Sequence, residues 1–206
     1  MKNLQELFVE QLKDVHSAER QLVKALPRMA KAATAPALRK AFESHLAVTK
    51  EQVARLDSVF EEVGARPGRK KCGAMEGLVQ EGDELIATGP APQVLDAGLI
   101  AAAQQVEHYE IAAYGTLRSY AKILGYKNAA KLLEKTLNEE GKTDTLLNDL
   151  AEGGINADAV APPEQDKNGA GKSLVGKAIQ AVAEATGLAT EPPAKAPKGG
   201  GRKKGG

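Results

Sequence analysis

The sequence predicts an all-α protein built as a four-helix bundle with a long crossover connection. Its 206 residues contain 42% apolar residues but no Trp and few other aromatics. Charged residues alternate with Ala and Leu, a balance that favours packed amphipathic helices over sheets. Four long segments show helical periodicity, and the length suits one domain with an extension.

The first two predicted helices form an antiparallel pair. One is expected over residues 4–33, where Pro27 marks a kink, because proline lacks the N–H that a helix interior needs. The other is expected over residues 37–63 and ends at the turn sequence GARPG. The short connection between them favours neighbouring antiparallel helices.

The second predicted pair covers residues 93–124, which stop at Gly125, and residues 128–151, which stop at GG. Between the pairs, residues 72–92 contain enough spaced apolar side chains for a short fifth helix inside the crossover. Two antiparallel pairs joined by one long connection are typical of a crossover bundle.

A change in composition divides the chain into a helical bundle over residues 1–155 and a tail over residues 156–206. The tail is rich in Ala, Pro, Gly and Lys and poor in large apolar residues, so it is expected to be disordered. It ends in KAPKGGGRKKGG, which has five basic residues and no acid. This end permits weak, salt-sensitive contact with nucleic acid.

The sequence indicates a soluble cytoplasmic protein without a membrane partner. Its single cysteine, Cys72, excludes an internal disulfide framework and a cysteine-rich zinc site, and favours a reducing compartment. The amphipathic N-terminus lacks the apolar segment of a signal peptide. No window approaches the roughly 18 apolar residues that span a bilayer.

Polar side chains interrupt the apolar stripe of every predicted helix near its middle. Traced in steps of three and four residues, the interruptions in chain order are Glu19; His45, Thr49 and Gln52; Glu110; and Glu140. The middles of bundle helices meet at one level, so these side chains are expected to converge on one buried place.

Three buried carboxylates repel one another and need a compensating cation, which a di-metal centre supplies. Carboxylate and imidazole ligands suit iron and manganese, and inward Glu and His residues on facing helices form the usual di-iron arrangement. Glu107 and Asp144 lie one turn from Glu110 and Glu140, so each could bridge or support the site. The sequence therefore predicts two ions of iron or manganese per bundle.

Each of these residues also has an alternative explanation. A glutamate in an apolar stripe can occupy a partly solvated edge position, and His45 can be a core histidine bonded to a backbone or acid partner. His108 lies about 200° around the helix from Glu110 and is expected to face elsewhere. The tyrosines beside the centre are interpreted as packing residues, with a redox partner of the centre as the alternative: Tyr109, Tyr114 and Tyr120.

Five segments of the chain closely resemble the YciF-like family of bacterial ferritin-like, rubrerythrin-related stress proteins. They are SAERQLVKALPRMA, AFESHLAVTKEQVARL, CGAMEGLVQEG, DAGLIAAAQQVEHYEIAAYGTL and AAKLLEKTLNEEGKTDTLLNDLA. The resemblance covers residues 3–152 and implies a dimeric four-helix bundle with an added short helix. It also implies an iron or manganese site at Glu19, Gln52, Glu110 and Glu140, and a ferroxidase or related protective role in stress.

The sequence departs from the usual di-iron pattern at two positions. Ferritin-like centres carry Glu-x-x-His on two helices, whereas this chain has Thr49-x-x-Gln52 and Glu140-x-x-Thr143. His45 or His16 could substitute only if the fold turns an imidazole inward.

Two functions remain open at this point. The first is a di-metal oxidoreductase that oxidises Fe(II) or handles peroxide, with Glu19, Glu110 and Glu140 as ligands. Glu107, His45 and Gln52 would be further ligands or their immediate support, and no separate catalytic residue is assigned. The second is a non-enzymatic helical stress protein with a metal-free buried polar network. A homodimer is expected in both cases.

Overall fold

The computed structural model describes residues 1–160, and within that range every regular element is helical. The long helices and the crossover helix are α1 (Leu4–Ala32), α2 (Pro36–Glu62), α3 (Gly73–Thr88), α4 (Pro92–Leu124) and α5 (Lys127–Leu150). The predicted all-α class, the four-helix bundle and the helix inside the crossover are confirmed. The tail expected to be disordered lies, from residue 161 onward, outside the described residues.

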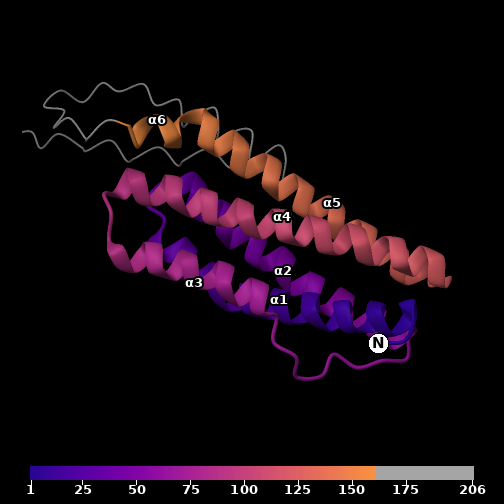
Figure 1. Cartoon of the computed structure of the whole chain (residues 1–206). Helices are drawn as coiled ribbons and strands as arrows, with labels where there is room; N and C mark the ends of the chain where they lie inside the picture. The colour runs from indigo at the N-terminus through magenta and orange to yellow at the C-terminus, as the bar shows by residue number, and fades with distance from the viewer. Residues whose placement is uncertain (161–206) are drawn as a thin grey trace, which may run out of the picture.

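The four long helices pack as two antiparallel hairpins laid side by side (Figure 1). α1 pairs with α2 and α4 with α5, while α1 also contacts α4 and α2 contacts α5. Because α2 ends at one end of the bundle and α4 begins at the other, the connection runs the length of the molecule. α3 lies along this connection and packs against α1 and α4.

Local sequence signals set the ends of these helices. The Asn3 side-chain oxygen accepts a hydrogen bond from the Glu6 N–H at 2.9 Å and caps α1. α2 and α4 each begin with a proline, which suits the first helical position because no N–H is needed there. α4 ends at Gly125, whose φ of 81° is readily adopted only by glycine. α1 continues through Pro27 to Ala32.

The end of α5 differs from the expected stop at GG. α5 ends at Leu150, and a π-helical turn (Ala151–Ile155) carries the chain through both glycines into α6 (Asn156–Asp158). Gly154, with φ of 145°, supplies the bend inside this turn. The π-helical turn and α6 both contact α4, so the helical structure extends slightly beyond residue 155.

The core consists of two apolar clusters separated by a polar layer. The first cluster includes Leu22, Phe42, Leu99 and Leu147. The second, toward the opposite end of the bundle, includes Phe8, Leu12, Leu56 and Leu133. The polar residues between them are therefore closed off from water at both ends of the bundle.

No helix within residues 1–160 has the length and apolar composition needed to cross a membrane. The basic segment that could contact nucleic acid lies beyond the described part of the chain. The homodimer stays a prediction.

A buried carboxylate joins the α1–α2 turn to the start of α4. Asp96 accepts hydrogen bonds from the Thr34 N–H at 2.7 Å, the Thr34 hydroxyl at 2.5 Å and the Ala35 N–H at 2.7 Å. Ala35, the residue before α2, has no side chain that could cap the helix. Asp96 therefore supplies this cap from another helix and fixes how the two hairpins meet.

We expect Asp96→Ala to lower the free energy of unfolding by about 2–4 kcal/mol, because buried donors at the turn lose a charged acceptor. Urea unfolding monitored by circular dichroism measures the loss. Asp83→Ala is the matched control: Asp83 is 45% exposed and pairs with Arg28 at 2.7 Å, so its loss should cost less than about 1 kcal/mol. Equal losses in the two variants would contradict this role for Asp96.

Candidate metal centre

Four side chains from three helices meet in the polar layer between the apolar clusters. His45 on α2, Glu107 and Glu110 on α4, and Glu140 on α5 each place one potential ligand atom within 4.8 Å of the others. All four residues are buried. Glu107 and Glu110 are three residues apart and so project from the same face of α4.

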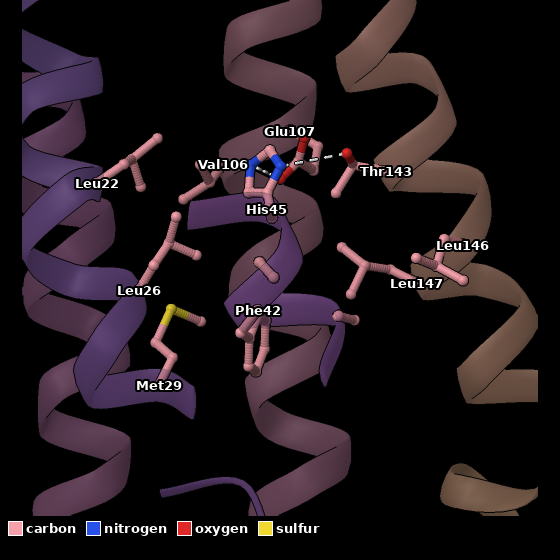
Figure 2. Close-up of a pocket in the computed structure, with 12 residues that line it drawn as sticks. Leu22, Leu26, Met29, Phe42, His45, Val106, Glu107, Thr143, Leu146 and Leu147 are labelled. Carbon is pink, nitrogen blue, oxygen red and sulfur yellow. Dashed lines mark hydrogen bonds and ion pairs between the residues drawn. The ribbon is translucent and has the colours of Figure 1, made fainter. Parts of the chain in front are cut away.

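The His45 imidazole points into this group (Figure 2). Its Nε2 lies 3.3 Å from Glu107 Oε1 and 3.9 Å from Glu140 Oε2. Its Nδ1 lies 3.3 Å from the Thr143 hydroxyl oxygen, which donates its own hydrogen to the Glu139 carbonyl at 3.2 Å. Thr143 therefore accepts from Nδ1–H, and Nε2 is left as the ring nitrogen with a free lone pair.

Burial lowers the pKa of His45 to about 4, although the nearby charge of Glu139 acts in the opposite direction. The imidazole is consequently neutral at physiological pH. A neutral ring with its unprotonated nitrogen toward three carboxyls is in the state that binds a metal.

The carboxyl groups of the layer are poorly suited to carry charge without a cation. Burial raises the pKa of Glu19, Glu107 and Glu110 well above the ordinary carboxyl value, and the charges of neighbouring glutamates raise it further. Burial likewise raises the pKa of Glu140 to about 8, even though hydrogen bonds from Glu107 and Gln52 lower it. Without a cation, the layer retains protons near neutral pH.

Five buried oxygens of this layer have no hydrogen-bond partner among the described residues. They are Glu19 Oε2, Gln52 Oε1, Glu107 Oε2, Glu110 Oε1 and Glu140 Oε2. Buried oxygens are nearly always paired, and such a concentration in one place requires an explanation. Protons held between neighbouring carboxyls satisfy part of this set in the metal-free protein, and a bound cation would satisfy all five oxygens together.

Tyr114 packs in the second apolar cluster, as interpreted from the sequence, and it also belongs to this layer. Its hydroxyl donates a short hydrogen bond to Glu19 Oε1, and its ring is completely buried. Tyr114 follows Glu110 by four residues and so lies on the same face of α4, a spacing that could have identified it. Tyr109 instead contacts the Cys72 sulfur at 3.1 Å, and Tyr120 packs in the second apolar cluster.

Arg55 is a second member that the sequence reasoning missed. Its Nη1 donates to Thr136 Oγ1 at 2.5 Å and to Glu139 Oε2 at 2.7 Å. It follows Gln52 by three residues, one turn along the same face of α2. The charge of Arg55 also lowers the pKa of Glu19 and Glu140, but burial outweighs this effect, and both pKa values stay raised.

The Gln52 side-chain nitrogen donates to Glu140 Oε1 and, at 3.3 Å, to Glu139 Oε2. This arrangement holds the Glu140 carboxyl in place. It also leaves the Gln52 amide oxygen as one of the five unpaired acceptors.

The structure places other candidate residues outside the group. His16 pairs with Asp57 at 3.2 Å near the surface, so it does not replace a missing ligand. His108 is exposed, as expected, and its imidazole lies 3.2 Å from Asp144. The Thr49 hydroxyl donates to the His45 backbone carbonyl at 2.8 Å.

The set of donors suits a hard or borderline cation. It consists of carboxylate oxygens, one amide oxygen and one imidazole nitrogen, a combination typical of iron and manganese sites. Thr143 stands where the Glu-x-x-His pattern would put a histidine, yet its hydroxyl orients the imidazole that His45 brings from α2. The fold thus supplies one of the two absent imidazoles from another helix.

Comparisons with known proteins agree with this architecture. A family model described as a domain of unknown function, DUF892, matches residues 3–160. The protein YciF of Escherichia coli strain K12 is 49% identical over 160 residues, which are 77% of this chain and 96% of YciF. The chain spans nearly the full length of that relative.

Solved structures show the same fold. The crystal structure of the E. coli stress protein YciF has a TM-score of 0.74 and 48% identity, over 76% of this chain and 99% of that one. The protein YcfI from Rhodopseudomonas palustris has a TM-score of 0.70 and 42% identity, over 72% of this chain and 94% of that one.

The metal-free protein should lose stability as pH rises from 6.5 to 9. A raised carboxyl pKa stabilises the folded state fully below the unfolded value of 4.5, and this contribution is lost as pH rises through the folded value, about 8 for Glu140. The lowered pKa of His45 opposes this decline just above pH 6.5, because the unfolded imidazole still loses protons there, and the opposition fades by about pH 7.5. Melting curves in chelator across this range test the expected decline.

Glu110→Gln should flatten that decline by up to about 1.4 kcal/mol per pH unit for the proton it removes. Glu51→Gln is the matched control, because Glu51 is an exposed glutamate on α2. If both variants kept the wild-type dependence, Glu110 would not titrate as a buried group.

Proposed function

The chain belongs to the DUF892 family, and we propose that its buried centre binds two ions of iron or manganese and supports the oxidation of Fe(II) during stress. The observation that carries this proposal is the group of five unpaired buried oxygens around a neutral imidazole. The stress context comes from the similarity to the E. coli stress protein YciF.

We assign the residues of the layer to two groups, each of which would hold one ion. His45, Glu107, Glu110 and Glu140 already have their donor atoms close together and would hold the first ion. Glu19 interacts with the charges of Glu110 and Glu140 from the α1 side of the layer. Its unpaired oxygen, together with that of Gln52, would hold the second ion beside shared carboxylates.

Charge balance supports the number two. Four glutamates without a cation of their own carry four negative charges when ionised, and two divalent ions neutralise them. Arg55 pairs with Glu139 at 2.7 Å, and Glu139 also lies 3.8 Å from Lys135, so Arg55 offsets only part of the charge of the four glutamates. Because the glutamates hold protons in the absence of metal, ion binding is expected to release protons.

The surrounding residues would prepare the site for electron transfer from Fe(II), which gives up one electron per ion. Thr143 orients His45 through Nδ1, and Gln52 positions Glu140. Tyr114 directs a hydroxyl hydrogen at Glu19. The apolar clusters on either side exclude water, so the oxidant must enter through the protein interior.

A metal-free structural role is the second candidate, because Arg55, Gln52 and Tyr114 already make hydrogen bonds within the layer. YcfI, one of the similar structures, is itself described as a candidate structural protein. In this case acid-to-amide substitutions would preserve or raise the melting temperature, and added iron or manganese would leave it unchanged.

We expect the wild-type protein to take up two ions and to melt at a higher temperature in the presence of Fe(II) or Mn(II). At a free metal concentration of 100 times Kd, one bound ion adds about 2.7 kcal/mol to the free energy of unfolding. Glu110→Gln should lose most of the bound metal and of the oxygen-dependent Fe(II) oxidation, whereas Glu51→Gln should keep both. Elemental analysis, melting curves and oxidation rates provide the measurements. Equal metal content and rate in the two variants would exclude the proposed centre.

Thr143→Val should weaken metal binding by about 10–100-fold, because the imidazole loses the acceptor that fixes its Nδ1–H and hence its orientation. Thr143→Ser retains the hydroxyl and should bind nearly as tightly as the wild type. Competition with a chromophoric chelator measures the affinities. Wild-type affinity in Thr143→Val would show that Thr143 does not position His45.

A further inference from the structure

We propose that an apolar cavity beside His45 and Glu107 binds dioxygen as the oxidant for Fe(II), an inference that rests on the proposed function. The cavity occupies about 20 Å³ between α1, α2, α4 and α5, on the side of the centre that faces the α1–α2 turn. Its polar boundary is formed by His45, Glu107 and Thr143, so whatever it holds lies against the centre.

The rest of the wall is apolar (Figure 2). Its larger side chains are Leu22, Leu26, Met29, Phe42, Val106 and Leu147. Two alanines, Ala41 on α2 and Ala103 on α4, complete the wall. The room exists largely because these two positions carry only a methyl group.

The cavity is large enough for one small molecule but is a poor site for water. A buried water needs two to four polar partners, and a volume above about 10–15 Å³ can hold one. His45 Nδ1 and the Thr143 hydroxyl are already bonded to each other. Among the polar atoms of the wall, this leaves His45 Nε2 and the unpaired Glu107 oxygen, both of which the proposed metal would engage.

This chemistry discriminates between the two candidate oxidants. Hydrogen peroxide donates and accepts hydrogen bonds, and would lose them in an aliphatic cavity without compensation. Dioxygen has no hydrogen bonds to lose. Dry, aliphatic cavities of proteins take up apolar guests such as xenon for the same reason.

A second apolar cavity indicates how a gas could arrive. It also occupies about 20 Å³, lies between α1, α3 and α4, and shares Leu22, Met29 and Val106 with the first. Its outer wall includes Asp83, whose side chain is 45% exposed at the surface of α3. Rotation of the shared side chains would join the two cavities and connect the surface to His45.

The proposed step balances with dioxygen as the electron acceptor. Two Fe(II) ions each give one electron, and dioxygen with two protons becomes hydrogen peroxide while two Fe(III) ions form. The two protons come from solvent, because metal binding has already displaced those that the glutamates held.

Three consecutive alanines on α4 provide the experiment. Ala103 lines the inner cavity, Ala102 lines the outer one, and Ala101 is exposed. In crystals of the manganese-loaded protein under xenon pressure, we expect one xenon atom between Leu22, Ala103 and Leu147. Ala103→Leu should remove it, whereas Ala101→Leu should keep it. An ordered water in the wild-type cavity, or no xenon there, would overturn the proposal.

The kinetic measurement uses the iron-loaded protein. Ala103→Leu should raise the KM for dioxygen in Fe(II) oxidation by about tenfold or more and leave the affinity for iron unchanged, because the leucine fills the cavity. Ala102→Leu should keep the inner xenon site but slow the entry of dioxygen, because the leucine would fill the outer cavity. Ala41→Leu fills the same cavity from α2 and replaces Ala103→Leu if that variant does not fold.

The outcomes separate this inference from the proposed function. Iron uptake without a xenon site, or an unchanged KM for dioxygen in both cavity-filling variants, would overturn the dioxygen site alone. A protein that takes up no iron would overturn the proposed function, and the oxidant role with it.

Discussion

Four carboxyl groups buried without a balancing cation are the constraint on which the rest of this molecule depends. Glu19, Glu107, Glu110 and Glu140 lie between two apolar clusters, where an isolated charge is costly. The nearby Arg55 guanidinium also pairs with Glu139, and its charge does not outweigh the burial of Glu19 and Glu140. The folded protein must therefore hold protons in this layer or take up cations, and both choices couple its stability to its surroundings.

The side-by-side packing of the four long helices makes such a layer possible. Because these helices run alongside one another, their middle turns meet at one level. Residues of one helix then complete the interactions of another. Thr143 on α5 orients the imidazole of His45 on α2, and Asp96 on α4 caps the start of α2. The centre is a property of the packed bundle rather than of any single helix.

The apolar surroundings have two consequences that belong together. They raise the carboxyl pKa values by removing water, and they leave small spaces that water does not fill readily. An inner space against His45 and an outer one under α3 share three side chains. In this interpretation α3 does more than bridge the two hairpins, because it covers the approach to the centre.

The sequence by itself determined the helical class, the bounds of the four long helices to within one residue, and the common level of Glu19, Glu110 and Glu140. Helical periodicity fixes the angle and height of each side chain, which is all that these inferences need. Only the tertiary structure decided that His45 rather than His16 turns inward, and that Tyr114 and Arg55 join the layer. Those outcomes depend on rotamers and on partners from other helices, which one helix's pattern does not contain. The cavities could not be predicted from the sequence either, because their position depends on how side chains from several helices pack together.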